Sequence, residues 1–247
     1  MKRKAGRGVL EGAFLLLEEL ARNGEAGPTQ LAAATGLHKA TAHRLLDQLV
    51  GVGAVQRCAG RYRVGPQMFR LGQAWEPVRV LRAAVGPPLR QLAAASRRTS
   101  VSVGVPAADS GRILIGCGIR GEADEICAMR AGWVLPPGAA AEIVLTASGP
   151  QAEPPEKYSG REWKKLLAEA RDRGVAFDYS DGVSPLCCVA APVRSASGDV
   201  VAAVGAVALD QRRLPSLAEA VRRAANVASA NLARFPSYGP CGLDPLG

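Results

Sequence analysis

The apolar positions at the start of the chain recur at helical spacing and predict two helices before residue 37. A stripe at spacings of three and four marks the first helix and consists of Leu10, Phe14, Leu17, Leu20 and Ala21. We expect this stripe to pack behind the helices that follow it. The second helix is predicted between Thr29, a candidate N-cap, and Gly36, which suits a helix C-terminus.

A third helix is predicted from about Lys39 to Val50, after a turn at residues 36–38. Its apolar face consists of Ala42, Leu45, Leu46 and Leu49. Cationic and short polar side chains lie on the other side, at Lys39, Ala40, Thr41, His43, Arg44 and Asp47. Two short helices joined by a tight turn, with such residues exposed on the second one, are typical of a helix-turn-helix that enters the major groove of DNA.

The next segment predicts a basic β-hairpin. Residues 54–57 and 61–64 form strands in this interpretation, and Cys58-Ala59-Gly60 joins them. Arg57, Arg61 and Arg63 suit contacts with phosphates or with the minor groove. The alternative is a three-helix bundle whose surface is merely solvated. The hairpin and its arginines favour a winged helix-turn-helix.

Helical periodicity continues after this hairpin. Residues 66–75 predict a linking helix, and a further amphipathic helix is expected to be bent or interrupted at Pro87-Pro88. The apolar residues of that second helix are Leu81, Val85, Leu89, Leu92 and Ala93.

Beyond Arg98 the hydrophobic period changes to two. Val101, Val103 and Val105 alternate, as do Ile113 and Ile115 after a turn, which predicts an antiparallel hairpin. Ser159 and Glu162 form a capping box for a helix that Gly174 ends. Further strands are predicted at residues 175–179, 188–193 and 200–209, and a closing helix at about 216–234. The chain is therefore expected to be α+β, with helices packed on an antiparallel sheet.

Charge is concentrated in the first 75 residues, which carry eleven Lys and Arg residues against five acids. The remaining residues carry 20 basic and 17 acidic side chains, so most of the net charge of +9 lies in less than a third of the chain. This asymmetry indicates a polyanionic partner.

The sequence disfavours an enzyme. Residues 116–121 match G-x-G-x-x-G, but an acidic run follows where a helix should bind a pyrophosphate, so we interpret the motif as a loop or bulge. Ser184, Cys187 and Cys188 are possible nucleophiles, yet no histidine follows His43. Asp178 and Asp181 are more typical of a solvated loop. We therefore expect no catalytic residues and no cofactor.

The spacing of the cysteines and the length of the apolar runs argue against metal-binding, membrane-spanning and secreted proteins. The six cysteines contain no C-x-x-C pair, and adjacent Cys187 and Cys188 favour a core position over a metal site, although a thiol sensor at Cys188 stays open. No apolar run is long enough to span a membrane, and acidic residues interrupt the first apolar stretch, so no secretory signal is expected. The default location is the cytoplasm.

Three segments carry a resemblance to a known family: residues 31–46 (LAAATGLHKATAHRLL), 62–66 (YRVGP) and 188–193 (CVAAPV). The arrangement resembles the isocitrate lyase regulator (IclR) family of bacterial transcription factors. The resemblance implies a winged N-terminal domain that binds DNA and contributes to dimerisation. It also implies a GAF- or PAS-like C-terminal domain that holds a small effector.

The resemblance places Lys39, Thr41 and Arg44 on the recognition helix and Thr29 near a phosphate. His38 stands where the family usually has proline, and Ala40 where it usually has serine. The segment after Pro136 lacks the histidine and the Gly-Lys pair that the family often shows, and the stretch between Ala147 and Ser159 is shortened. The effector pocket is expected at Gly132, Leu135, Pro136, Asp181, Cys188 and Ala190.

We therefore predict a winged helix-turn-helix domain over 1–65, a linker helix over 66–80, an effector-binding domain over 81–234 and a disordered tail over 235–247. The predicted function is a DNA-binding repressor that acts as a homodimer, or as a tetramer, on a pseudo-palindromic double-stranded operator. A small-molecule effector would modulate its operator affinity. The alternative is a ligand-independent regulator with a degenerate sensor domain.

Overall fold

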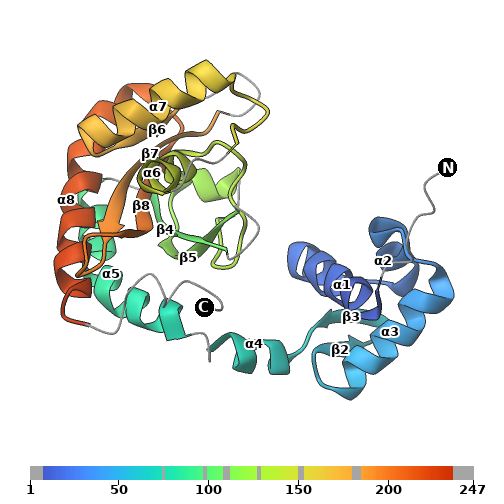
Figure 1. Cartoon of the computed structure of the whole chain (residues 1–247). Coiled ribbons are helices and arrows are strands. Elements are labelled where there is room, and N and C mark those ends of the chain that lie inside the picture. Colours follow the sequence, from blue (N-terminus) through green and yellow to red (C-terminus); the bar gives the residue numbers. More distant parts are fainter. Residues whose placement is uncertain are drawn as a thin grey trace. The chain divides into compact units, whose positions relative to one another are not determined.

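The computed structural model describes residues 8–73, 76–96, 99–107, 112–126, 129–149, 153–179 and 185–235. The chain divides into two compact units, Met1–Trp75 and Glu76–Gly247 (Figure 1). Residues 236–247, most of the segment expected to be disordered, lie outside the described residues, as do the basic side chains of residues 2–7. No helix within the described ranges is long and apolar enough to cross a membrane.

The first unit is a three-helix bundle with a small sheet. Its elements are α1 (Val9–Asn23), β1 (Glu25–Ala26), α2 (Pro28–Thr35), α3 (Lys39–Gly51), β2 (Val55–Cys58), β3 (Arg61–Val64) and α4 (Pro66–Gln73). The predicted hairpin is confirmed, with β2 and β3 antiparallel and a turn at Ala59-Gly60. Strand β1 pairs with the other edge of β3, which gives the order β1-β3-β2. The sequence analysis missed β1, because two residues are too few to show a period.

The buried face of α1 differs from the predicted stripe. Leu16, Leu17 and Leu20 are buried, whereas Leu10 and Phe14 are 76% and 59% exposed. The expectation that Leu10 and Phe14 pack inward was therefore wrong, as it was for the exposed Ala21. The physical reason lies at Gly12, which is buried against α3: a Cβ there would lie 3.0 Å from Leu45 Cδ1. Close packing at this glycine turns the Leu16 side of the helix toward the core.

Helix α2 begins earlier than predicted. Its N-cap is Gly27 and Pro28 occupies the first turn, so Thr29 lies inside the helix and the prediction of Thr29 as the N-cap was wrong. The fixed φ of proline and its missing N–H suit the first helical position. Gly36 ends the helix in the left-handed conformation, as predicted.

The second unit is a five-stranded sheet between two pairs of helices. Its elements are α5 (Glu76–Ala95), β4 (Ser100–Pro106), β5 (Ile113–Ile119), the 3-10 turn η1 (Glu122–Glu125), α6 (Ala140–Ser148), α7 (Gly160–Arg173), β6 (Ala176–Asp178), β7 (Cys187–Arg194), β8 (Val200–Ala208), η2 (Gln211–Arg213) and α8 (Leu214–Leu232). All neighbouring strands are antiparallel in the order β5-β4-β8-β7-β6, which confirms the predicted α+β class. Helices α5 and α8 cover one face, and α6 and α7 the other (Figure 1).

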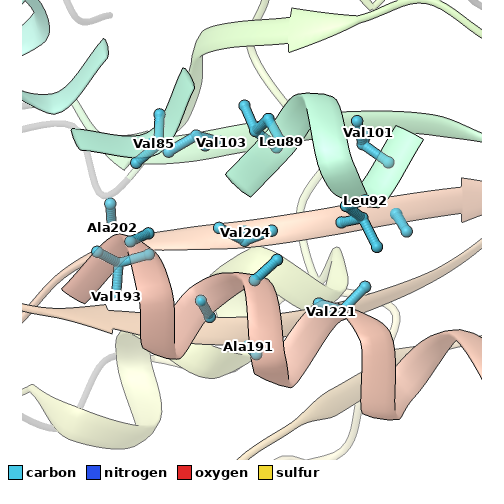
Figure 2. Packing of buried hydrophobic residues seen from close by; sticks show 14 of the residues in the cluster. Val85, Leu89, Leu92, Val101, Val103, Ala191, Val193, Ala202, Val204 and Val221 are labelled. Carbon is cyan, nitrogen blue, oxygen red and sulfur yellow. The ribbon is translucent and has the colours of Figure 1, made fainter. Parts of the chain in front are cut away.

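Alternation along β7 shows how this sheet fills two cores. Val189, Ala191 and Val193 point to the α5–α8 side, while Ala190 packs with α6 and α7. Figure 2 shows Val85, Leu89 and Leu92 of α5 and Val221 of α8 gathered over β4, β7 and β8. The side chains are mostly small, so helices and strands approach closely.

Helix α5 continues through Pro87 and Pro88, so the predicted interruption does not occur. A proline lacks the N–H that would bond the carbonyl four residues earlier. The Asn231 side-chain amide of α8 donates to the Ala84 carbonyl at 2.9 Å and so replaces the bond that Pro88 cannot make. Helix α6 was not predicted, because its alanine-rich sequence shows no clear periodic stripe.

Candidate nucleic-acid interface and ligand cavity

Helix α3 separates a buried face from a polar one. Ala42, Leu45, Leu46 and Leu49 are buried, as predicted. The side chains at Lys39, Ala40, His43 and Arg44 are exposed, and Thr41 is half-buried. Thr29 is exposed on α2. Helix α3 therefore exposes short side chains together with the cations Lys39 and Arg44. A recognition helix needs such a face in order to approach base edges.

The wing presents three exposed arginines, each with a partner. The guanidinium of Arg57 lies 5.7 Å from the centre of the buried Tyr62 ring. Arg61 Nε lies 2.9 Å from Glu25 Oε1, and Arg61 Nη2 also donates to the Glu25 carbonyl. Arg63 Nε donates to the Gln56 side chain at 3.1 Å. These contacts hold the cations on one small sheet.

Sequence reasoning missed the role of Glu25. It lies 36 residues before Arg61, and the pairing of β1 with β3 brings the two together. Only the short strand β1 could have signalled this contact. The Glu25 carboxylate reduces the positive charge that the wing offers to a phosphate.

The second unit contains a cavity of about 240 Å³ on the α6 side of the sheet. Its floor comes from β4, β7 and β8, and its walls from the segment between η1 and α6 and from residues near α7 and β6. Apolar side chains dominate, including Met129, Trp133, Leu135 and Leu186. Such an apolar hollow with a few polar groups is typical of a small-molecule site.

Four of the six predicted pocket residues line this cavity: Leu135, Pro136, Cys188 and Ala190. Gly132 is described but does not line the cavity, and it bonds through its N–H to the Ile115 carbonyl instead. Asp181 lies outside the described residues. Cys187 is buried in the core as predicted, whereas its neighbour Cys188 lines the cavity, because successive residues of a strand point to opposite faces.

A polar group of side chains lies at one edge of the cavity. Lys157 Nζ bonds Asp178 Oδ1 at 3.0 Å and lies 5.0 Å from the centre of the Tyr158 ring. Both Lys157 and Tyr158 pack over Gly138, whose φ is +76° and where a Cβ would lie 2.8 Å from Tyr158 Cε2. Glu142 accepts a hydrogen bond from the Gly138 N–H. Sequence analysis did not single out Lys157, which has no local motif.

Burial and charge shift the pKa values of this group. Burial raises the pKa of Glu142, although the Gly138 N–H and Lys157 oppose that change. Burial alone would lower the pKa of Lys157, but the charge and hydrogen bond of Asp178, together with Tyr158, raise it overall. Burial also raises the pKa of Tyr158. Lys157 is therefore an ammonium ion bonded to the Asp178 carboxylate at neutral pH.

The G-x-G-x-x-G match at residues 116–121 is explained by the pairing of strands in the sheet. Gly116 is the extra residue at a register shift in which Val103 faces Cys117 and Gly104 faces Ile115, so the predicted bulge is confirmed. Only a four-residue 3-10 turn follows it, too short to bind a pyrophosphate as a helix N-terminus would. Within the described ranges, no three His, Cys, Asp or Glu side chains gather as a potential metal site.

Two family models match the chain. The IclR helix-turn-helix domain matches residues 9–58, and the bacterial transcriptional regulator IclR C-terminal domain matches residues 159–230. The chain is 29% identical over 246 residues to the glycerol operon regulatory protein of Streptomyces coelicolor, with 90% of this chain and 95% of that protein covered.

Solved structures share the fold. An IclR homologue from Microbacterium hydrocarbonoxydans, crystallised with 4-hydroxybenzoate, matches with a TM-score of 0.77 and 22% identity over 92% of this chain and all of that one. The IclR protein of Thermotoga maritima matches with a TM-score of 0.66 and 19% identity over 91% and 98% of the two chains. Both the helix-turn-helix bundle and the sheet domain are thus accounted for, and the chain belongs to the IclR family of DNA-binding transcriptional regulators, which are not enzymes.

Proposed function

We propose that this protein is a homodimeric repressor whose operator affinity changes when a small molecule enters the cavity of the second unit. The observation that carries the proposal is the cavity of about 240 Å³, because a degenerate sensor domain would be free to fill that space with side chains. The cavity thus favours this function over the ligand-independent alternative. A chromosomal operator as target implies a cytoplasmic location.

Arg44 is proposed to contact a base edge, with Lys39 and Thr41 in support. Arginine can bond guanine O6 and N7 with two parallel hydrogen bonds, which gives discrimination between bases. His43 and Ala40 lie on the same exposed side of α3 and would border the groove. Arg57, Arg61 and Arg63 on the wing, with Thr29 on α2, would contact phosphates and set the register of the domain on DNA.

A second copy of the chain is proposed to cover the exposed apolar residues of the first unit. Val9, Leu10 and Phe14 on α1 are 55%, 76% and 59% exposed, and Phe69 and Leu71 on α4 are 71% and 55% exposed. Large exposed apolar side chains on successive turns of one helix, such as Leu10 and Phe14, suit burial in a protein interface. A two-fold dimer would present two α3 helices to two half-sites, which matches a pseudo-palindromic operator.

A route from the cavity to the linker runs through Arg82 of α5. Trp133 and Leu135 line the cavity, and their segment bonds to β5: the Ile115 N–H donates to the Trp133 carbonyl at 2.8 Å. The next carbonyl in β5, that of Gly116, accepts bonds from Arg82 Nε and Nη2 at 3.2 and 3.1 Å. A ligand that displaced Trp133 would therefore move α5, the first helix after α4. Such a change alters operator affinity only if the ligand prefers one of the two states.

Similarity to characterised relatives supports a ligand and a regulated operon. The Microbacterium homologue was crystallised with 4-hydroxybenzoate, and the Streptomyces relative regulates a glycerol operon by its name. These ligands and targets are those of the relatives. They support a small organic effector here without fixing its identity.

The test is the binding of purified protein to the DNA upstream of its own gene, measured by fluorescence anisotropy against scrambled competitor at two salt concentrations. We expect tight binding that scrambled DNA does not displace, and higher transcription from that promoter when the gene is deleted. Equal displacement by scrambled DNA, with a steep salt dependence, would contradict sequence-specific binding at this locus.

A further inference from the structure

We infer that the cavity takes a compact, uncharged molecule with an apolar body and one hydrogen-bonding group, such as a primary amide or an alcohol, in preference to the corresponding carboxylate. This inference rests on the proposal that the cavity is the effector site, and it names the class of ligand for that site.

The size and walls of the cavity set the body of the ligand. Its volume of about 240 Å³ lies below the range of about 300–1,000 Å³ that is usual for drug-sized ligands. Trp133, Met129 and Leu135 supply large apolar surfaces, and the sheet supplies small residues such as Ala190 and Ala206. A single ring or a short branched chain matches this space.

The charges at the cavity edge oppose an anion. Lys157 and Asp178 are the charged residues among the described lining residues, and they already bond each other at 3.0 Å. A carboxylate ligand that recruited Lys157 would leave Asp178 facing a like charge in a half-buried place. Glu142 accepts a hydrogen bond from the Gly138 N–H, and Lys157 packs over Gly138, so a second acidic side chain lies near this edge. Like charges brought together in a half-buried place repel, so an anion gains little from this site.

An uncharged group with both a donor and an acceptor fits the same edge without breaking the ion pair. Lys157 bonds Asp178 through one N–H of its ammonium group and can donate to a ligand from another. Ser102 adds a hydroxyl from β4 that can do either. A primary amide or an alcohol can bond these groups while its apolar body contacts Trp133.

The experiment compares acids with their neutral counterparts of the same shape. Full-length protein is titrated at pH 7.5 by calorimetry with three pairs: benzoate and benzamide, 4-hydroxybenzoate and 4-hydroxybenzamide, cyclohexanecarboxylate and cyclohexanecarboxamide. We expect the amide of each pair that binds to have a Kd about ten-fold lower or more than that of the acid, because the acid is ionised at this pH. Amides that bind no better than acids would overturn the inference and leave the effector cavity standing.

A variant of Asp178 tests the same preference for amide over acid by changing the protein instead of the ligand. Asp178→Asn removes the carboxylate that neutralises Lys157, so the preference should shift toward the acid by about ten-fold. Asp172→Asn, an exposed site on α7, is the matched control and should keep the wild-type preference. An unchanged preference in Asp178→Asn, with its thermal unfolding intact, would overturn the role of the ion pair. Binding of none of the six compounds to wild-type protein would count against the effector cavity itself.

Discussion

Arg61 of the wing is bound to Glu25 of β1, with 2.9 Å between its Nε and the carboxylate Oε1 and a second bond to the Glu25 carbonyl. Both side chains are about half exposed. The pair therefore competes with any phosphate that Arg61 would contact.

Glu25→Gln should increase DNA affinity, because it removes the negative charge that partly neutralises Arg61. Arg61→Ala should weaken binding to all sequences alike and lower the slope of log K against log salt by about one unit. Anisotropy titrations at several salt concentrations measure both effects. Glu19→Gln on α1, where Glu19 pairs with Arg22, is the matched control. An unchanged salt slope in Arg61→Ala would remove Arg61 from the interface.

Arg44→Ala should cost on the order of 1–3 kcal/mol of operator binding and relax specificity at one base pair, if Arg44 bonds a guanine. The measurement is a set of operator variants, each with one base pair changed, titrated with wild-type and variant protein. Arg171→Ala on α7 changes the same residue type outside the first unit and should leave the pattern unchanged. An equal loss on every operator variant would assign Arg44 to the phosphate backbone instead.

Phe14→Ser and Phe69→Ser should weaken self-association, because each removes an exposed aromatic ring from the proposed dimer surface. Light scattering coupled to size exclusion, over a range of protein concentrations, measures the shift toward monomer. Val52→Ser, at a site 67% exposed beyond the end of α3, is the control for loss of an exposed apolar side chain. Wild-type protein that is monomeric at all concentrations would contradict the dimer.

Ser159→Ala should destabilise the second unit by about 1 kcal/mol at neutral pH, which is the usual cost of losing a serine N-cap. Hydrogen bonds from the Ser159 hydroxyl, and then from its backbone N–H, lower the pKa of Glu162 below its usual value. A carboxyl whose pKa is lower in the folded protein stabilises the fold above its unfolded pKa, near 4.5, and loses that contribution as the pH falls through the folded value.

The stability difference between wild type and Ser159→Ala should therefore shrink below about pH 4. Urea unfolding between pH 3 and 7 measures it. The control is Ser216→Ala in the first turn of α8, where the exposed serine hydroxyl donates to the Arg213 carbonyl. That bond involves no carboxylate, so its loss should show no such trend with pH. A difference for Ser159→Ala that stays constant down to pH 3 would show that Glu162 does not contribute through its charge.

Local sequence signals determined much of the fold. The alternation at Val101, Val103 and Val105 and the capping box at Ser159 depend on neighbours in the chain, and both predictions are confirmed. The polar face of α3 followed in the same way from the spacing of Leu45, Leu46 and Leu49. Helical and strand periods are properties of the backbone, so they can be read before any tertiary contact is known.

Contacts between distant residues were decided by the tertiary structure. Close packing at Gly12 leaves Phe14 exposed on α1. The Asn231 side chain bonds the Ala84 carbonyl that Pro88 leaves without its helical donor. The pairing of β1 with β3 places Glu25 next to Arg61. The pairing of Lys157 with Asp178 at the cavity edge has the same origin, since 21 residues separate them. The sequence alone indicated most of the helices and strands and the family resemblance, because these depend on local patterns. Which charges are neutralised could be seen only in the folded protein, because it depends on which side chains the packed core brings within hydrogen-bonding distance.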